Sequence, residues 1–167
     1  MNLNPFQASF RARYLLGFVV CVALLAFAIF TQFQWGLEPC PLCIFQRIAF
    51  AALAIAFLVG GLHAPHGVGG RRGYGTLAVL AAVVGIGIAG RHVWLQLNPP
   101  TMPSCGPTFD FLRDTLDTTS LIRRVLQGSG DCGAVDWTFL GLSMPAWSLF
   151  WFIVLGLWAA TAFSRRR

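Results

Sequence analysis

The stretch CPLCIFQRIAFAALAIAFLVGGL, residues 40–62, joins a C-x-x-C pair directly to a long apolar run. The run is long enough to cross roughly 30 Å of hydrocarbon as a helix. Pro41 suits the first turn of such a helix, because that position needs no backbone N–H donor. The stretch therefore predicts a dithiol where a membrane-spanning helix begins.

Three further windows resemble this apolar run, which gives four predicted spans at approximately 14–33, 44–62, 74–95 and 144–163. Only 11% of the residues are charged, against about 25% in soluble domains. We predict an all-α membrane protein, a four-helix transmembrane bundle forming a single membrane domain over residues 1–167. The predicted connections are 34–43 and 96–143 on one side of the membrane and 63–73 on the other.

The charges alternate with the spans. Arginines precede the first span at Arg11 and Arg13, separate the second from the third at Arg71 and Arg72, and follow the fourth at 165–167. All six acidic residues lie in the other connections. Arginine-rich segments stay in the cytoplasm, so we expect both termini there and both cysteine-bearing loops outside. The net charge of +6 is thus explained by topology, and the dispersed arginines argue against nucleic-acid binding.

The outer connection 96–143 contains an interrupted amphipathic pattern at 109–127. Asp117 offers a helix cap in its middle, so one or two short helices are expected. Two positions for this segment stay open at this point: it either lies on the membrane surface or packs on the bundle as an ordinary loop helix.

Cys40 and Cys43 have the spacing of a redox dithiol or of half a zinc site. Zinc usually needs about four suitably spaced ligands, and the other outward cysteines are far apart in the chain, so we expect no metal. Cys43 would lie in the first helical turn, where backbone amides favour the thiolate. Arg47 follows four residues later on the same helical face, which adds a positive charge near Cys43.

Cys105 and Cys132 form a second pair in the same outer loop, within turn-forming sequence. Alone, they would predict a structural staple. A second dithiol facing the same compartment favours exchange, since exposed disulfides are the labile ones. Cys21 lies inside the first span, where a cysteine behaves as a small hydrophobe, and it receives no role.

Two other features of the third span need interpretation. Gly85, Gly87 and Gly90 spell G-x-G-x-x-G, but no strand precedes them, so we interpret these glycines as helix-packing residues rather than a nucleotide site. His92 lies near the outer end of this span, at the predicted depth of Cys43. It is a candidate hydrogen-bonding or proton-donating residue for a membrane-bound electron acceptor.

These motifs together resemble the DsbB family of quinone-linked thiol oxidases of the bacterial inner membrane. The resemblance covers nearly the whole chain. It rests on CPLCIFQR (40–47), RHVWLQL (91–97), Cys105 in a proline-rich loop, and GDC (130–132) followed by Trp137, FLGL (139–142) and the pair Met144 and Pro145.

The resemblance implies a route for electrons. A reduced periplasmic dithiol protein of the DsbA type would attack the Cys105–Cys132 disulfide at Cys105, and Cys132 would then exchange with Cys40. Cys43 would be freed to reduce a quinone, either ubiquinone or menaquinone. The resemblance also implies that Arg47, and less directly His92 and Met144, line the quinone site.

Three alternatives stay open. The chain is equally compatible with a specialised relative that serves one dedicated partner. A vitamin K epoxide reductase relative would combine similar features, but there the loop pair precedes the C-x-x-C pair, whereas here it follows. A metal-binding or scaffold membrane protein is a different class, and stoichiometric zinc without quinone would favour it.

Overall fold

Four long helices dominate the computed structural model, which describes residues 10–36, 39–99, 111, 114–127, 133 and 137–164. They are α1 (Phe10–Trp35), α2 (Pro41–His63), α3 (Val68–Leu97) and α6 (Met144–Ser164), and each contains a stretch long and apolar enough to cross a membrane. Every predicted span lies within one of them. The predicted four-helix membrane bundle is therefore confirmed.

The helices extend beyond most of the predicted boundaries. The predicted connection 63–73 shrinks to a short link, because α3 already begins at Val68 and its first turn is closed by the Arg71 N–H donating to the Gly67 carbonyl. Ala64, in the left-handed conformation, ends α2 and donates to the carbonyl of Gly60. Hydropathy identifies the part of a helix that must be apolar, whereas hydrogen bonding decides where the helix stops.

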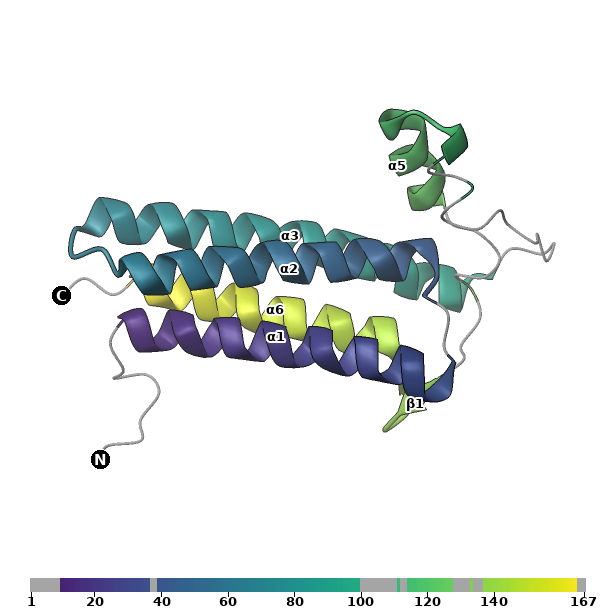
Figure 1. Ribbon diagram of the computed structural model, residues 1–167, viewed down its shortest axis with the longest axis horizontal. Helices are drawn as coiled ribbons and strands as arrows, with labels where there is room; N and C mark the ends of the chain where they lie inside the picture. The colour runs from purple at the N-terminus through teal and green to yellow at the C-terminus, as the bar shows by residue number, and fades with distance from the viewer. Residues whose placement is uncertain are drawn as a thin grey trace.

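The chain runs up and down through the bundle, so that both ends of the described chain lie at one end of it (Figure 1). α2 packs between α1 and α3, and α3 packs closely against α6. The shared core includes Phe50 and Phe152, whose rings stack at 3.9 Å. Large apolar side chains cover the outside, which suits lipid rather than water; examples are Val19, Ile55, Leu80, Val84 and Leu157.

Gly85 explains the close packing of α3 on α6. A Cβ atom at this position would lie 2.3 Å from the Phe152 ring, so only glycine fits. Gly87 and Gly90 have open space around them. The interpretation of the glycine motif as a packing motif is thus confirmed for its first member, and helix contact does not require the other two.

Arginines make interhelical contacts at the end of the bundle where α1 begins and α6 ends. Arg13 donates to the Thr161 hydroxyl over 2.6 Å and lies over the Trp158 ring at 5.0 Å. Arg71 lies over the ring of Phe10 at 5.6 Å. The basic segments that contain Arg13 and Arg71 therefore lie at the same end of the bundle, whereas residues 165–167 lie outside the described part of the chain.

The opposite end carries the outer connections. α5 (Thr118–Gln127) begins where the Asp117 carboxylate accepts hydrogen bonds from the backbone N–H groups of Thr119 and Ser120, which confirms the predicted cap. Val125 of α5 is buried against Leu42 and Leu95. This contact confirms packing on the bundle, and the position of α5 relative to lipid stays a prediction.

A short antiparallel hairpin, β1 (Thr138–Phe139) and β2 (Leu142–Ser143), leads into α6. Its turn places Leu140 and Gly141 at positive φ, 51° and 78°. Two successive positive φ values match the twist of a two-residue hairpin, and glycine adopts the second at little steric cost.

Candidate functional site: a dithiol beside an apolar cavity

Cys40 and Cys43 lie at the very start of α2. Cys40 is the N-cap residue, with an extended backbone, and its sulfur accepts a hydrogen bond from the Cys43 N–H over 3.4 Å. Pro41 occupies the first helical turn, as the sequence predicts. Both cysteines thus lie at the N-terminal end of a helix, beside the unpaired backbone amides of its first turn.

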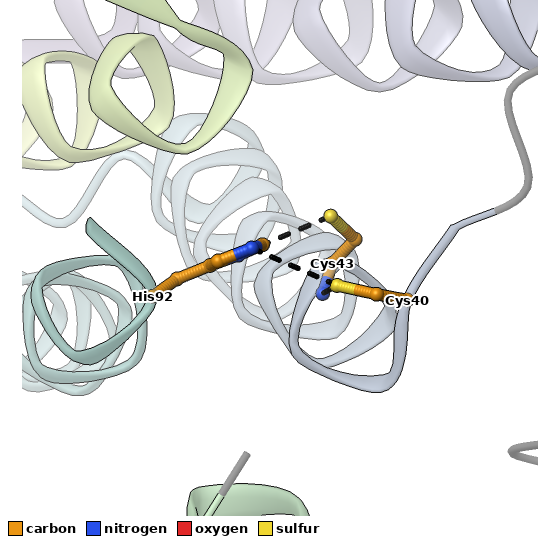
Figure 2. A group of neighbouring side chains, drawn as sticks. All are labelled: Cys40, Cys43 and His92. Carbon is orange, nitrogen blue, oxygen red and sulfur yellow. Dashed lines mark hydrogen bonds between the residues drawn. The ribbon is translucent and has the colours of Figure 1, made fainter. Parts of the chain in front are cut away.

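His92 of α3 approaches both sulfur atoms from the neighbouring helix. Cys40 Sγ lies 3.7 Å from His92 Nε2, and Cys43 Sγ lies 4.0 Å from Nδ1. Figure 2 shows the ring directed at the two cysteines. The imidazole is only 2% exposed. Proximity in the sequence does not reveal this contact, because 49 positions separate Cys43 from His92.

Gln46 completes this cluster, and sequence reasoning assigned it no role. Its side-chain amide nitrogen lies 2.9 Å from His92 Nδ1. In this arrangement the amide N–H donates to Nδ1, and the matching ring tautomer carries its proton on Nε2, the nitrogen nearest Cys40. The sequence signal that could have identified Gln46 was its position on the helix: Gln46 follows Cys43 by three residues and so shares its helix face.

Arg47 anchors α2 to α1 beside the dithiol. Its guanidinium donates to the Gln32 side-chain oxygen over 2.6 Å and to the Ala28 carbonyl over 3.0 Å. Two directed bonds hold the charged group within the bundle instead of letting it extend to the membrane surface. Arg47 shares one face of α2 with Cys43, and both residues line the same cavity.

That cavity has a volume of about 500 Å³ and a predominantly apolar wall. Cys43, Gln46 and Arg47 supply polar groups on the α2 side. The rest of the lining comes from α1, α2, α6 and the hairpin segment: Leu24, Leu25, Phe27, Ala28, Phe50, Trp137, Phe139, Met144, Trp147, Ser148 and Trp151. A thiol therefore opens into a space suited to a flat apolar molecule with a few polar atoms.

Aromatic side chains from the hairpin segment and α6 form part of the cavity wall. Trp137 stacks with Phe139 at 6.0 Å between ring centres and meets Phe27 edge-on at 6.1 Å. The Trp147 indole N–H donates to the Phe139 carbonyl over 3.1 Å, which fixes the hairpin on α6. The hairpin thus positions two aromatic rings of the lining that come from a connection rather than from a span.

The predicted site residues differ in where the structure places them relative to the cavity. Arg47 and Met144 both line the cavity. His92 is not part of the lining and contacts the dithiol instead. Cys105 and Cys132 lie outside the described residues. Cys21 is fully buried in the core of the bundle, consistent with the prediction that it behaves as a small hydrophobe.

The fold and this site define a class: a multi-pass membrane protein with a dithiol at the start of one of its membrane helices. The comparisons agree with that class. The sequence model of the family described as "Disulfide bond formation protein DsbB" matches residues 10–162. The chain belongs to the DsbB family, and its role is thus in disulfide bond formation.

Relatives are similar along almost their entire length. "Disulfide bond formation protein B" of Xanthomonas campestris pv. campestris (strain 8004) is 58% identical over 166 residues, covering 99% of this chain and 96% of the relative. The protein of the same name from Xanthomonas euvesicatoria pv. vesicatoria (strain 85-10) is 59% identical over 167 residues, with 99% and 97% covered. That of Xylella fastidiosa (strain 9a5c) is 56% identical over 156 residues, with 93% and 90% covered.

Proposed function

We propose that this protein reoxidises a periplasmic dithiol protein of the DsbA type and delivers the electrons to a membrane quinone. One observation carries the proposal: the Cys43 side chain forms part of the wall of a 500 Å³ apolar cavity inside a membrane bundle. A dithiol that only exchanged with soluble proteins would need no such cavity.

The cavity residues fit a quinone head group. Trp147, Trp151 and Phe50 offer flat apolar surfaces for a ring, and Arg47 and Gln46 offer N–H donors for carbonyl oxygens. When bound, a quinone would supply an acceptor for two electrons and two protons. Either ubiquinone or menaquinone satisfies this chemistry.

The described residues prepare Cys40 and Cys43 for oxidation. The two thiols form one disulfide and release two electrons and two protons. His92 Nε2 lies 3.7 Å from Cys40 Sγ, where it can exchange a hydrogen bond with the sulfur, and the backbone amides of the first turn of α2 lie beside Cys43.

Cys105 and Cys132 complete the proposed relay by family resemblance. Cys105 would receive the partner's thiolate, and Cys132 would then exchange with Cys40, which returns the dithiol of α2 to its reduced state. Each exchange breaks one disulfide and forms one, so the electron count is conserved.

The proposed location is the bacterial inner membrane, with the termini cytoplasmic and the cysteines periplasmic. The distribution of charge supports this orientation. Arg13 and Arg71 lie at the end of the bundle that carries the termini, opposite the dithiol. An oxidising periplasm also suits a protein that forms disulfides.

The test is quinone reduction by purified protein in detergent, followed optically after a reduced DsbA-type partner is added. We expect turnover that Cys43→Ala abolishes and Cys21→Ala leaves intact. Cys105→Ser should stop oxidation of the partner while bound quinone is retained. Absence of turnover with either quinone type, in folded protein with both pairs oxidised, would refute the proposal.

A further inference from the structure

Three soft-metal ligands converge at the start of α2. One ligand atom each from Cys40, Cys43 and His92 can be chosen so that all three lie within 4.8 Å of one another. The sequence argued against a metal because the C-x-x-C pair lacked partners at a suitable spacing. The packing of α3 against α2 supplies the missing imidazole, as Figure 2 shows.

We propose that the reduced Cys40–Cys43 dithiol, together with His92, binds one thiophilic cation of the Zn²⁺ class, and that this cation holds the dithiol in its reduced form. Two thiolates and a nitrogen are ligands that soft and borderline cations prefer, whereas Mg²⁺ and Ca²⁺ prefer oxygen. Three protein ligands leave a fourth position for water, as in open zinc sites.

The geometry requires only small movements. Tetrahedral Zn²⁺ with bonds of about 2.3 Å to sulfur and about 2.0–2.1 Å to nitrogen places ligand atoms roughly 3.5–3.8 Å apart. Cys40 Sγ and His92 Nε2 are already 3.7 Å apart. Rotation of the Cys43 side chain brings the third ligand within reach.

Gln46 can serve both states of His92. In the present arrangement its amide N–H donates to Nδ1, which leaves the proton on Nε2. When Nε2 binds a cation, the proton moves to Nδ1, and the Gln46 amide turns over so that its oxygen accepts. Metal-bound histidines ordinarily have such a partner on the second nitrogen.

Charge balance favours a divalent cation in this partly buried position. Each cysteine loses its proton to solvent as its sulfur bonds to the cation, and no electron is transferred. Two thiolates, a neutral imidazole and a divalent cation sum to zero charge, which reduces the cost of burial. A disulfide has no thiolate to offer, so binding is restricted to the reduced form.

The consequence for activity rests on the proposed function: the bound cation would compete with disulfide formation and inhibit oxidation of the dithiol. Linkage sets the size of the effect. At a cation concentration of about 100 times Kd, the equilibrium ratio of dithiol to disulfide rises about 100-fold. This change raises the midpoint potential of the two-electron couple by about 59 mV.

The test is a titration of the full chain in detergent with Cd²⁺, whose bonds to thiolate absorb in the ultraviolet. Cys105→Ser and Cys132→Ser are introduced so that the loop cysteines do not contribute. The protein is reduced, freed of reductant and kept anaerobic. We expect one Cd²⁺ per chain, binding at least tenfold weaker in His92→Gln, and no uptake once Cys40 and Cys43 form a disulfide.

His63→Gln is the matched control, because His63 lies at the other end of α2 and contacts Tyr74. Equal affinity in His92→Gln and the parent protein would overturn the proposal, as would no uptake by the reduced chain. If His92→Gln does not fold, X-ray absorption of the Zn²⁺-loaded parent decides. A shell of two sulfurs and an imidazole nitrogen supports the site, and a shell without nitrogen refutes it.

These outcomes are independent of quinone turnover. If the protein binds Cd²⁺ as expected but never reduces quinone, the proposed function is refuted and the cation site is supported. If the protein takes up no cation and its turnover is normal and not slowed by excess Zn²⁺, the cation site is refuted and the oxidase function is supported.

Discussion

The Gln46 side-chain amide donates a hydrogen bond to Nδ1 of His92 over 2.9 Å, with both side chains buried at the α2–α3 contact. This bond favours the His92 tautomer that carries its proton on Nε2, the nitrogen nearest Cys40. It links the helix that carries the dithiol to the helix that carries the imidazole, and so connects the packing of the bundle to the chemistry of the sulfur atoms.

Gln46→Leu should therefore affect both stability and rate. The substitution leaves the buried Nδ1 atom without its donor, which costs about 1–3 kcal/mol of folding free energy. Loss of the fixed tautomer should slow thiol oxidation by about tenfold, the equivalent of one ordinary hydrogen bond. Stability is measured by unfolding in denaturing detergent, and rate by quinone reduction. Gln46→Asn, with a shorter side chain, serves as a polar comparison. Parent values for both quantities in Gln46→Leu would contradict the role.

Arg47→Gln should weaken the use of quinone. It removes a charged donor beside the cavity together with its bonds to Gln32 and Ala28. Charge-assisted hydrogen bonds contribute about 1.5–3 kcal/mol, so the apparent KM for quinone should rise roughly 10- to 100-fold. Steady-state kinetics at varied quinone concentration measure this change.

Arg13→Gln is the matched control for Arg47. Arg13 is likewise bonded to another helix, is buried where Arg47 is half-buried, and lies at the opposite end of the bundle. Its loss should reduce stability and leave the KM for quinone unchanged. If both variants change KM alike, the effect of Arg47 is a general consequence of destabilisation.

Gly85→Ala should separate α3 from α6. The added methyl group would lie 2.3 Å from the Phe152 ring, which requires a shift of the helices. Overpacking of this kind costs about 1–3 kcal/mol. Gly87→Ala, two residues along the same helix in open space, should be neutral or stabilise by up to about 1 kcal/mol. Unfolding curves of the two variants are compared, and equal stability would show that α3 tolerates a side chain at Gly85.

Asp117 should make α5 sensitive to acid. Hydrogen bonds from Ser120, by its side chain first and its backbone second, hold the pKa of the Asp117 carboxyl below its usual value of 3.8. Because the folded pKa is the lower one, the cap stabilises α5 above pH 3.8 and is lost as the pH falls through the folded value.

Amide hydrogen exchange of α5 measures this cap. Asp117→Ala should speed exchange over Thr118–Gln127 at neutral pH, while Asp117→Asn, which also caps helices, should retain most of the protection. Equal protection in all three proteins at neutral pH would show that packing of Val125 alone holds the helix.

Local signals in the sequence were sufficient for the helices and for the dithiol. The apolar windows located all four spans, and Pro41 marked the start of α2 because a proline at that position loses no hydrogen bond. The cap at Asp117 was equally local, since a carboxylate reaches only the next turn of backbone. Such features depend on neighbours within a few residues.

The cavity lining was predicted only in part. Met144 was expected there by resemblance, while Trp147 and Phe139 were not assigned. Their positions depend on the hairpin, whose path is set by the turn at Leu140 and Gly141 and by the bond from Trp147 to Phe139. Aromatic residues near a membrane boundary have several possible uses, so composition does not select this one.

The sequence by itself determined the number of spans, the family, and the placement of a dithiol at the start of a membrane helix, because hydropathy, helix termination and motif spacing are all encoded locally. Only the tertiary structure decided that His92 approaches both sulfur atoms, that Gln46 orients it, and that Cys43 opens into a cavity beside Arg47. Those contacts join different helices, and the rotation of each helix about its axis is set by how complementary surfaces such as Gly85 and Phe152 pack.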